Sequence, residues 1–304
     1  MVTNTEKIFT FIDQFAAEND DIYLESVILA CNAWLSGETD LHLTEDVTKE
    51  EIRRGIQLAV LKGMKESAQP HHQMTPDAIG MLIGHIGTGL MKGYDQITLM
   101  DPAAGTGNLL FTVMNAMDGK ANGKSVEIDD LLVRLSAVVA ELLEQPVEFF
   151  VQDALRPLMI DPVDLVVADL PVGYYPDDEN ALNYQLMPAE GHAYAHHLFI
   201  EQSMNHLKEK GYGIFLVPAF LFESEQSDVL HRYLKKNADI RAVIQLPASL
   251  FKSEAHAKSI FILQKPAVGA RITKDVLLTK VPDMKNKQAM SSFLQQLDAW
   301  TEEG

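Results

Sequence analysis

Residues 97–110, Ile-Thr-Leu-Met-Asp-Pro-Ala-Ala-Gly-Thr-Gly-Asn-Leu-Leu, constrain the fold of this chain more than any other stretch. An apolar run ends in an acidic residue, small residues with two glycines follow, and a segment with helical apolar spacing then begins. This order predicts a strand, a tight turn and a helix. Glycines at such a turn let the backbone approach a ligand where a Cβ would collide, and the helix that follows presents unpaired N–H groups. The stretch therefore predicts a nucleotide-type cradle.

The spacing of the glycines limits the ligand. The third glycine of a dinucleotide site is absent, and no Lys-Ser/Thr pair follows, which excludes a P-loop. Residues 101–108 resemble motif I of class I S-adenosylmethionine (SAM)-dependent methyltransferases, in the Asp-Pro-Ala-x-Gly-x-Gly form of DNA methyltransferases that act on amino groups. A tight turn without a ligand would have similar glycines. The resemblance implies SAM as the cofactor, bound by Asp101, Ala103, Gly105, Gly107 and Asn108.

Composition limits the class of protein. With 304 residues, 47% hydrophobic and 22% charged, the chain can hold one large globular domain, or a principal domain with a smaller one attached. No apolar run reaches the length of a membrane span, and residues 1–20 are polar and acidic where a signal peptide needs an apolar core. We therefore expect a cytoplasmic protein. The single cysteine, Cys31, excludes an internal disulfide, and its apolar neighbours predict that it is buried.

The net charge of −18 bears on nucleic-acid binding, because proteins that bind duplex DNA unaided usually have a basic surface. The charge is uneven. Residues 232–287 contain 12 Lys/Arg against 4 Asp/Glu, whereas residues 118–201 contain 4 Lys/Arg against 16 Asp/Glu. A nucleic-acid face is therefore expected on the C-terminal part, although lysines that are simply exposed on late strands and helices would give the same counts.

Residues 1–70 have apolar residues at helical spacing and no alternating strand pattern, which predicts a helical N-terminal domain without recognisable chemistry. Thr75 and Pro76 then open a further helix, with Thr75 expected as its N-cap and Pro76 at its first position. In amino-methyltransferases a Thr-Pro pair before motif I, called motif X, packs against the methionine end of SAM. The resemblance implies that role here, and an ordinary helix cap is the alternative. The adjacent His71 and His72 indicate no metal site.

From residue 97 onward, apolar runs alternate with helical segments, which predicts a parallel sheet covered on both faces. Acidic residues end or follow three successive strands, at the edge where open sheets bind ligands. A carboxylate after the second strand can accept both ribose hydroxyls of a nucleoside, which makes Glu127, followed by Ile128, the candidate for that contact. Asp153 and Ala154 resemble motif III, which implies that Asp153 accepts a hydrogen bond from the adenine amino group of SAM.

The fourth predicted strand, residues 163–168, runs into Asp169-Leu170-Pro171-Val172. Amino-methyltransferases carry Asp/Asn-Pro-Pro-aromatic, their motif IV, at this position. An exocyclic amine is a poor nucleophile, so its two hydrogens must be accepted by fixed oxygens while an aromatic ring stacks on the extruded base. The resemblance implies that Asp169 and the carbonyl of Leu170 accept these hydrogens, beside Pro171.

Two positions depart from that pattern. Leu170 replaces the first proline, which loosens the backbone that aims its carbonyl. Val172 replaces the stacking ring and lacks the flat π-face that is worth roughly 1–3 kcal/mol per base. Tyr174 and Tyr175 are the candidates to replace the ring, and Tyr174 is the first choice. A methyltransferase for protein or small-molecule amines, or a SAM-binding protein with lost or altered activity, would tolerate the same departures.

Residues 173–197 form a long segment with many turn residues, which predicts a lid or substrate-recognition element beside the site. Its acidic residues 177–179 would repel phosphates. His192, His196 and His197 lack a nearby carboxylate pattern for a metal, so we expect solvent-facing or capping histidines and no metal site.

The later segments predict a helix at 195–210 ended by Gly211, and then strands at 212–218, 240–246 and 258–265. This arrangement closely resembles the end of the catalytic domain in modification subunits of type I restriction systems. Those subunits obtain sequence specificity from a partner. The resemblance thus implies DNA as a partner, bound through a separate specificity protein.

Together these features predict an α/β protein with a Rossmann-like class I methyltransferase fold. We expect a mostly parallel sheet of about seven strands with helices on both faces, a helical domain at 1–70, a methyltransferase domain at 71–285 and a C-terminal helix at 286–304. The predicted activity is SAM-dependent methylation of an exocyclic amino group, with adenine in DNA as the first candidate. A dinucleotide oxidoreductase has less support, because the third glycine is absent.

Overall fold

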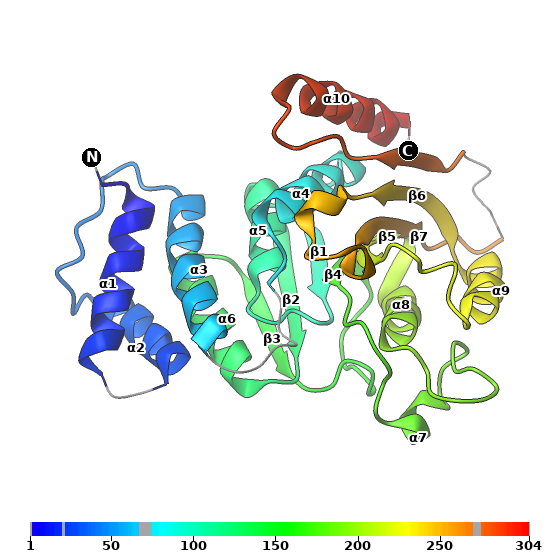
Figure 1. Cartoon of the computed structure of the whole chain (residues 1–304), viewed down its shortest axis with the longest axis horizontal. Helices are drawn as coiled ribbons and strands as arrows, with labels where there is room; N and C mark the ends of the chain where they lie inside the picture. Colours follow the sequence, from blue (N-terminus) through cyan, green and yellow to red (C-terminus); the bar gives the residue numbers. More distant parts are fainter. Residues whose placement is uncertain (1, 20–21, 67–73, 270–274, 304) are drawn as a thin grey trace.

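The computed structural model describes residues 2–19, 22–66, 74–269 and 275–303, and Figure 1 shows a helical N-terminal part beside a twisted sheet. The N-terminal part consists of α1 (Asn4–Glu18), α2 (Tyr23–Leu35) and α3 (Lys49–Glu66). A capping box at Thr3 and Glu6 begins α1, because each side chain accepts a hydrogen bond from the backbone N–H of the other residue. The apolar faces of the three helices pack together and against α6 (Asp130–Leu142), which joins this part to the rest of the fold.

The sheet has eight strands in the order β3-β2-β1-β4-β5-β7-β6-β8. All neighbouring pairs are parallel except those that β7 makes with β5 and β6, which are antiparallel. The α/β class and the mostly parallel sheet of the sequence prediction are therefore confirmed. The strands are β1 (Ile97–Asp101), β2 (Ala121–Glu127), β3 (Val147–Val151), β4 (Val163–Asp169), β5 (Leu207–Pro218), β6 (Asp239–Gln245), β7 (Lys258–Gln264) and β8 (Leu277–Lys280).

Helices cover both faces of the sheet. Along β5, Ile214 and Leu216 point into one apolar core, and Phe215 and Val217 point into the other, as alternation in a strand requires. One core is covered by α4 (Asp77–Leu90), α5 (Asn108–Ala116) and α10 (Lys287–Glu303), and the other by α8 (Ala195–His206) and α9 (Ser227–Asn237). The short α7 (Asp178–Ala181) lies in the segment between β4 and α8.

The sheet has eight strands, in agreement with the expectation of about seven, and β8 adds to β6 as a parallel edge strand. Two expectations about elements need correction. The helix predicted at 195–210 ends at His206, because Leu207 already pairs with Val163 of β4 and begins β5. Glycine at 211 therefore lies inside a strand and does not end a helix. The predicted domain boundary near residue 70, with His71 and His72, lies outside the described residues.

Candidate active site

The turn between β1 and α5 contains two glycines with different roles. Gly107 has φ +76°, and a Cβ there would lie 2.3 Å from the Ser136 hydroxyl and 2.5 Å from the Phe111 ring. Gly105 has φ +53°, and a Cβ there would meet no atom within 4 Å. Gly107 is therefore required by packing and backbone conformation, whereas Gly105 faces open space that a ligand can fill.

Asp101 and Glu127 lie beside this turn at the carboxyl ends of β1 and β2. Both oxygens of Glu127 accept backbone hydrogen bonds: Oε2 from Gly105 N at 2.8 Å, and Oε1 from Ile128 N at 2.8 Å and Asp129 N at 3.0 Å. Asp101 is only 1% exposed and accepts a hydrogen bond from Ala103 N at 3.0 Å. The Glu127 carboxylate thus holds the turn against the start of the next loop.

Three carboxyl groups, those of Asp101, Glu127 and Asp169, lie near one another at the site. Burial raises the pKa of Asp101 from 3.8 to about 8, and the nearby carboxylates of Glu127 and Asp169 act in the same direction, against the hydrogen bond from Ala103. A cationic ligand that enters beside these carboxylates would therefore be stabilised and would favour the charged form of Asp101.

Asp153, which follows β3, is held by residues from two loops. Its Oδ2 accepts a hydrogen bond from the Tyr175 hydroxyl at 2.5 Å, and its Oδ1 accepts one from Leu155 N at 2.9 Å. Tyr175 is buried, and it also accepts a hydrogen bond from Asn180. Its ring is therefore not free to stack on a substrate. Ala154 is buried as well, and its carbonyl accepts from Gln202 at 2.6 Å.

Asp169 ends β4 and has two side-chain partners. Its Oδ2 accepts a hydrogen bond from the Thr75 hydroxyl at 3.0 Å, and its Oδ1 forms an ion pair with the Lys258 ammonium at the start of β7. Sequence reasoning missed Lys258 as a site residue: the sequence shows it at the start of an apolar strand, but the pairing of that strand with β5 comes from the structure. Leu170 is buried, and its N–H donates to the Leu216 carbonyl at 3.2 Å, so the sheet fixes this backbone without the missing proline.

Thr75 and Pro76 adopt a different arrangement from the one predicted. Pro76 is the N-cap of α4, and the helix begins one residue later, at Asp77. The Thr75 side chain makes no cap hydrogen bond, because its hydroxyl donates to Asp169 instead. Its carbonyl accepts a hydrogen bond from the Asn108 side chain at 3.1 Å. Thr75 therefore connects the turn after β1 with the end of β4.

Aromatic side chains lie in the segment that follows Asp169. Tyr174 is exposed and stacks on Tyr194, with ring centroids 5.0 Å apart and ring planes 9° apart. Both hydroxyls reach Oε1 of Glu225, at 3.1 and 3.3 Å. Val172, at the motif IV ring position, is 58% exposed and Pro171 is exposed. The exposed ring nearest to Asp169 along the chain is thus that of Tyr174.

The histidines differ from the expectation. His192 is exposed and pairs with Asp178, but His196 and His197 are buried at the start of α8 and pack against Tyr194. Burial lowers the pKa of His196 to about 4 and that of His197 to about 3, so both rings are neutral at neutral pH. They act as packing rings here and are not solvent-facing or capping residues.

No group of three or more His, Cys, Asp or Glu side chains that could hold a metal ion occurs among the described residues. Cys31 is buried as expected, and burial raises its pKa to about 12. Within the described part of the chain, no helix has the length and apolar character of a membrane span.

Two family models match this chain. Residues 64–299 match the model described as N-6 DNA Methylase, and residues 9–64 match that of the YtxK N-terminal helical domain. The Bacillus subtilis protein YtxK, described as uncharacterized, is 49% identical over 252 residues, which are 83% of this chain and 77% of YtxK. The chain belongs to the N-6 DNA methylase family. The predicted resemblance to amino-methyltransferases is thereby confirmed.

Solved structures agree with a methyltransferase fold for this chain. A Listeria monocytogenes protein described as a candidate class I SAM-dependent methyltransferase is 38% identical, with a TM-score of 0.89 over 98% of this chain and 99% of that protein. A modification subunit of a candidate type I restriction enzyme from Vibrio vulnificus is 17% identical, with a TM-score of 0.68 over 90% of this chain and 62% of that protein. At this identity the similarity shows only that the two proteins share a fold. By family and fold the chain is a SAM-dependent methyltransferase with SAM as its cofactor.

The residues of this N-6 DNA methylase fit that cofactor. SAM has two positive groups, a sulfonium and an ammonium, and one carboxylate, so it is a net cation. The Glu127 carboxylate lies beside the turn, and Asp101, which holds a proton near neutral pH without a ligand, can release that proton to add a second negative charge when a cation binds. The open space at Gly105 and the exposed side chain of Ile128 leave room for a ligand at the edge of the sheet.

Proposed function

We propose that this chain methylates the exocyclic amino group of adenine in DNA, and that a separate specificity protein selects the sequence. The observation that carries the proposal is the position of Asp169. It ends β4 as the motif IV acid, its orientation is fixed by Thr75, and it lies near enough to Asp101 to raise the pKa of that residue. The family match to N-6 DNA Methylase supports the same acceptor chemistry.

The cofactor-binding roles follow from the positions at the carboxyl edge of the sheet. The turn residues Asp101, Ala103, Gly105, Gly107 and Asn108 hold the methionine portion of SAM, backed by Thr75 and Pro76. Glu127, with Ile128, takes the ribose hydroxyls. Asp153, with Ala154, takes the adenine amino group, and the hydrogen bond from the Tyr175 hydroxyl restricts the orientation of the Asp153 carboxylate. Bound SAM supplies an electrophilic methyl group on a sulfonium.

The protein's own contribution to the transfer is orientation of the acceptor amine. Asp169 and the Leu170 carbonyl accept its two hydrogens, and Pro171 restricts the backbone that follows. Holding two reactants in the right geometry can contribute roughly 7–11 kcal/mol toward the barrier. The exposed ring of Tyr174 replaces the motif IV aromatic side chain as the surface on which the base stacks.

Lys258 adds a hydrogen-bond donor beside the Asp169 acceptor. The amino group of adenine has a ring-nitrogen acceptor next to it, so an adjacent acceptor and donor on the protein match that edge of the base. The net charge of −18 disfavours binding to the DNA phosphates, so DNA binding depends on a basic partner. Type I modification subunits are among the proteins with this fold, which favours a separate specificity protein as that partner.

A second acceptor, a primary aliphatic amine, is favoured by the same ion pair, because Asp169 already holds the ammonium group of a lysine side chain. The two candidates separate in one assay. The purified protein is incubated with methyl-labelled SAM and either unmethylated plasmid DNA, single-stranded poly(dA) or poly-L-lysine, and the products are hydrolysed and identified by mass spectrometry.

N6-methyladenine that disappears in Asp169→Ala supports the first proposal. Label in poly-L-lysine without methyladenine refutes it in favour of the aliphatic amine. Plasmid DNA isolated from cells that express the protein is analysed in the same way, because cellular partners are then present. If that DNA also contains no N6-methyladenine, the adenine assignment is overturned.

A further inference from the structure

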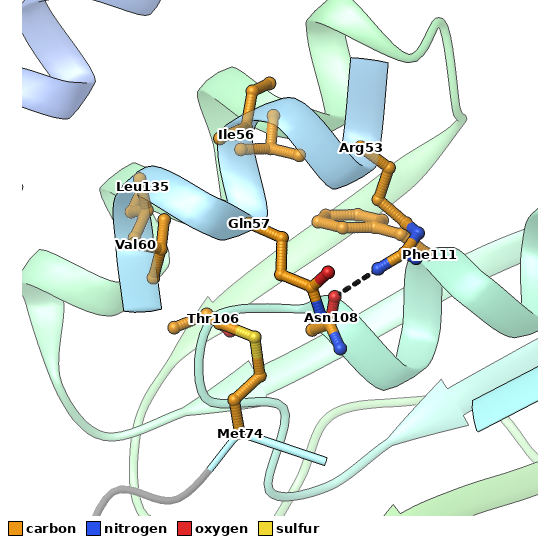
Figure 2. A pocket seen from close by; sticks show the side chains of 10 residues that line it. Arg53, Ile56, Gln57, Val60, Met74, Thr106, Asn108, Phe111 and Leu135 are labelled. Carbon is orange, nitrogen blue, oxygen red and sulfur yellow. Dashed lines mark hydrogen bonds between the residues drawn. The ribbon is translucent and has the colours of Figure 1, made fainter. Parts of the chain in front are cut away.

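Arg53 in the helical N-terminal part reaches the cofactor turn. It lies on α3, its side chain is 1% exposed, and Figure 2 shows its guanidinium directed toward Asn108, the first residue of α5. Nη1 donates to Asn108 Oδ1 at 2.5 Å. The neighbouring side chains of α3 line a small cavity of about 20 Å³ against Thr106 and Met74, so this helix lies directly over the turn after β1.

The remaining donors of Arg53 are satisfied by two carboxylates. Nε and Nη2 donate to Glu50 at 2.8 and 2.7 Å, and Nη2 lies 3.0 Å from Oδ1 of Asp77, the first residue of α4. Burying a guanidinium without partners is costly, and these two ion pairs offset that cost. The contact with Asn108 is therefore not needed to neutralise Arg53 and has a separate consequence.

That consequence is the orientation of the Asn108 amide. A guanidinium can only donate, so the Asn108 oxygen must face Arg53 and the NH₂ group must face away from it. The NH₂ group then donates to the Thr75 carbonyl at 3.1 Å, and the Thr75 hydroxyl donates to Asp169 at 3.0 Å. Three successive hydrogen bonds thus connect the helical part with the acid at the end of β4.

We propose that Arg53 is a positioning residue of the methyltransferase site, which fixes Asn108 and Thr75 for cofactor binding and, through Thr75, the carboxylate of Asp169. This inference rests on the proposed assignment of those three residues. It gives the N-terminal helical domain a role in forming the site in addition to packing against α6.

The test compares Arg53→Lys with Arg54→Lys. The lysine at position 53 keeps a charge for Glu50 and Asp77 but has no planar fork to orient the Asn108 amide. Arg54 is the matched control, because it is the next residue on α3, its side chain is 54% exposed, and its Nε pairs with Oδ2 of Asp77 at 3.7 Å. SAM affinity is measured by calorimetric titration, and thermal unfolding is recorded for each variant.

We expect SAM binding about tenfold weaker or more in Arg53→Lys, because displacement of positioning groups by a fraction of an ångström has effects of that size. Arg54→Lys should stay within about twofold of the wild type. Hydrogen exchange of residues 74–77 and 103–110 should be faster in Arg53→Lys alone. If that variant unfolds below the titration temperature, Arg53→Gln, which leaves no buried charge at this position, repeats the test.

A folded Arg53 variant that binds SAM like the wild type, with unchanged exchange in both segments, overturns the proposal. Equal weakening in the Arg53 and Arg54 variants also overturns it, because the effect would then belong to α3 as a whole. Asp101→Asn is titrated in parallel. Unchanged affinity in that variant refutes the proposed cofactor site, whereas unchanged affinity in Arg53→Lys alone refutes only the role of Arg53.

Discussion

Asp101→Asn should change how the stability of the protein without SAM depends on pH. Burial raises the pKa of Asp101 from 3.8 to about 8, so the native state holds a proton that the unfolded state has released between these values. Stability therefore falls as pH rises through this range, by up to about 1.4 kcal/mol per pH unit. Because the slope decreases near the native pKa, this single group accounts for about 2 kcal/mol between pH 6 and pH 8.

Asparagine at this position is close in shape to a protonated aspartate and does not titrate. We therefore expect the difference in free energy of unfolding, Asp101→Asn minus wild type, to be about 2 kcal/mol larger at pH 8 than at pH 6, because only the wild type loses stability over this range. Urea unfolding at pH 6, 7 and 8 measures this difference. Asp275→Asn, an exposed carboxyl in the described part of the chain, serves as the control and should keep the wild-type pH dependence.

The refuting result is equally specific. If the wild type and Asp101→Asn differ by the same free energy at pH 6 and pH 8, Asp101 is ionised in the native state throughout this range. The charge argument for a cationic ligand would then lose its main support. A change in the urea m-value instead of the midpoint would indicate an altered denatured state and not the titration of Asp101.

Three further outcomes are expected. SAM binding at pH 7 should release a proton from Asp101, because a nearby cation favours the carboxylate; the calorimetric enthalpy should then depend on the ionisation enthalpy of the buffer in the wild type and not in Asp101→Asn. Gly107→Ala should destabilise the fold by about 2 kcal/mol or more, since a Cβ there would lie 2.3 Å from a serine hydroxyl. Gly105→Ala, with open space around the added Cβ, should cost only about 1–2 kcal/mol of backbone strain. Chemical denaturation of the two variants measures the difference. Lys258→Met should lower the free energy of unfolding by about 1–3 kcal/mol, because Asp169 then keeps a half-buried charge without its ion pair. The double variant with Asp169→Asn should recover part of that loss. Equal stability of Lys258→Met and the wild type would contradict this expectation.

The sequence was most informative where a property depends on local chain geometry. The order of apolar run, acid, glycines and helix predicted the turn after β1, because positive φ at Gly105 and Gly107 is a local requirement that the residue type satisfies. The alternation of strands and helices along the chain likewise predicted the class of fold, since parallel strands need crossover connections, usually helices. The acids Asp101 and Glu127 could be placed at one edge for the same reason.

Predictions from local signals failed where long-range contacts compete with them. Thr75 looks like an N-cap in sequence, but its hydroxyl is taken by Asp169, 94 residues away. The helix from Ala195 was predicted too long, because pairing of Leu207 with β4 ends it after His206. His197 is fully buried, although nothing in the spacing of the histidines distinguishes it from a surface residue.

The sequence by itself determined the class of fold, the glycine turn and the order of the acidic residues, because periodicity and backbone conformation are properties of neighbouring residues. Only the tertiary structure decided which side chains meet at the site. Lys258 reaches Asp169 from 89 residues away, and Arg53 reaches Asn108 from 55 residues away. Such pairs depend on how whole helices and strands pack, and no local pattern specifies that packing.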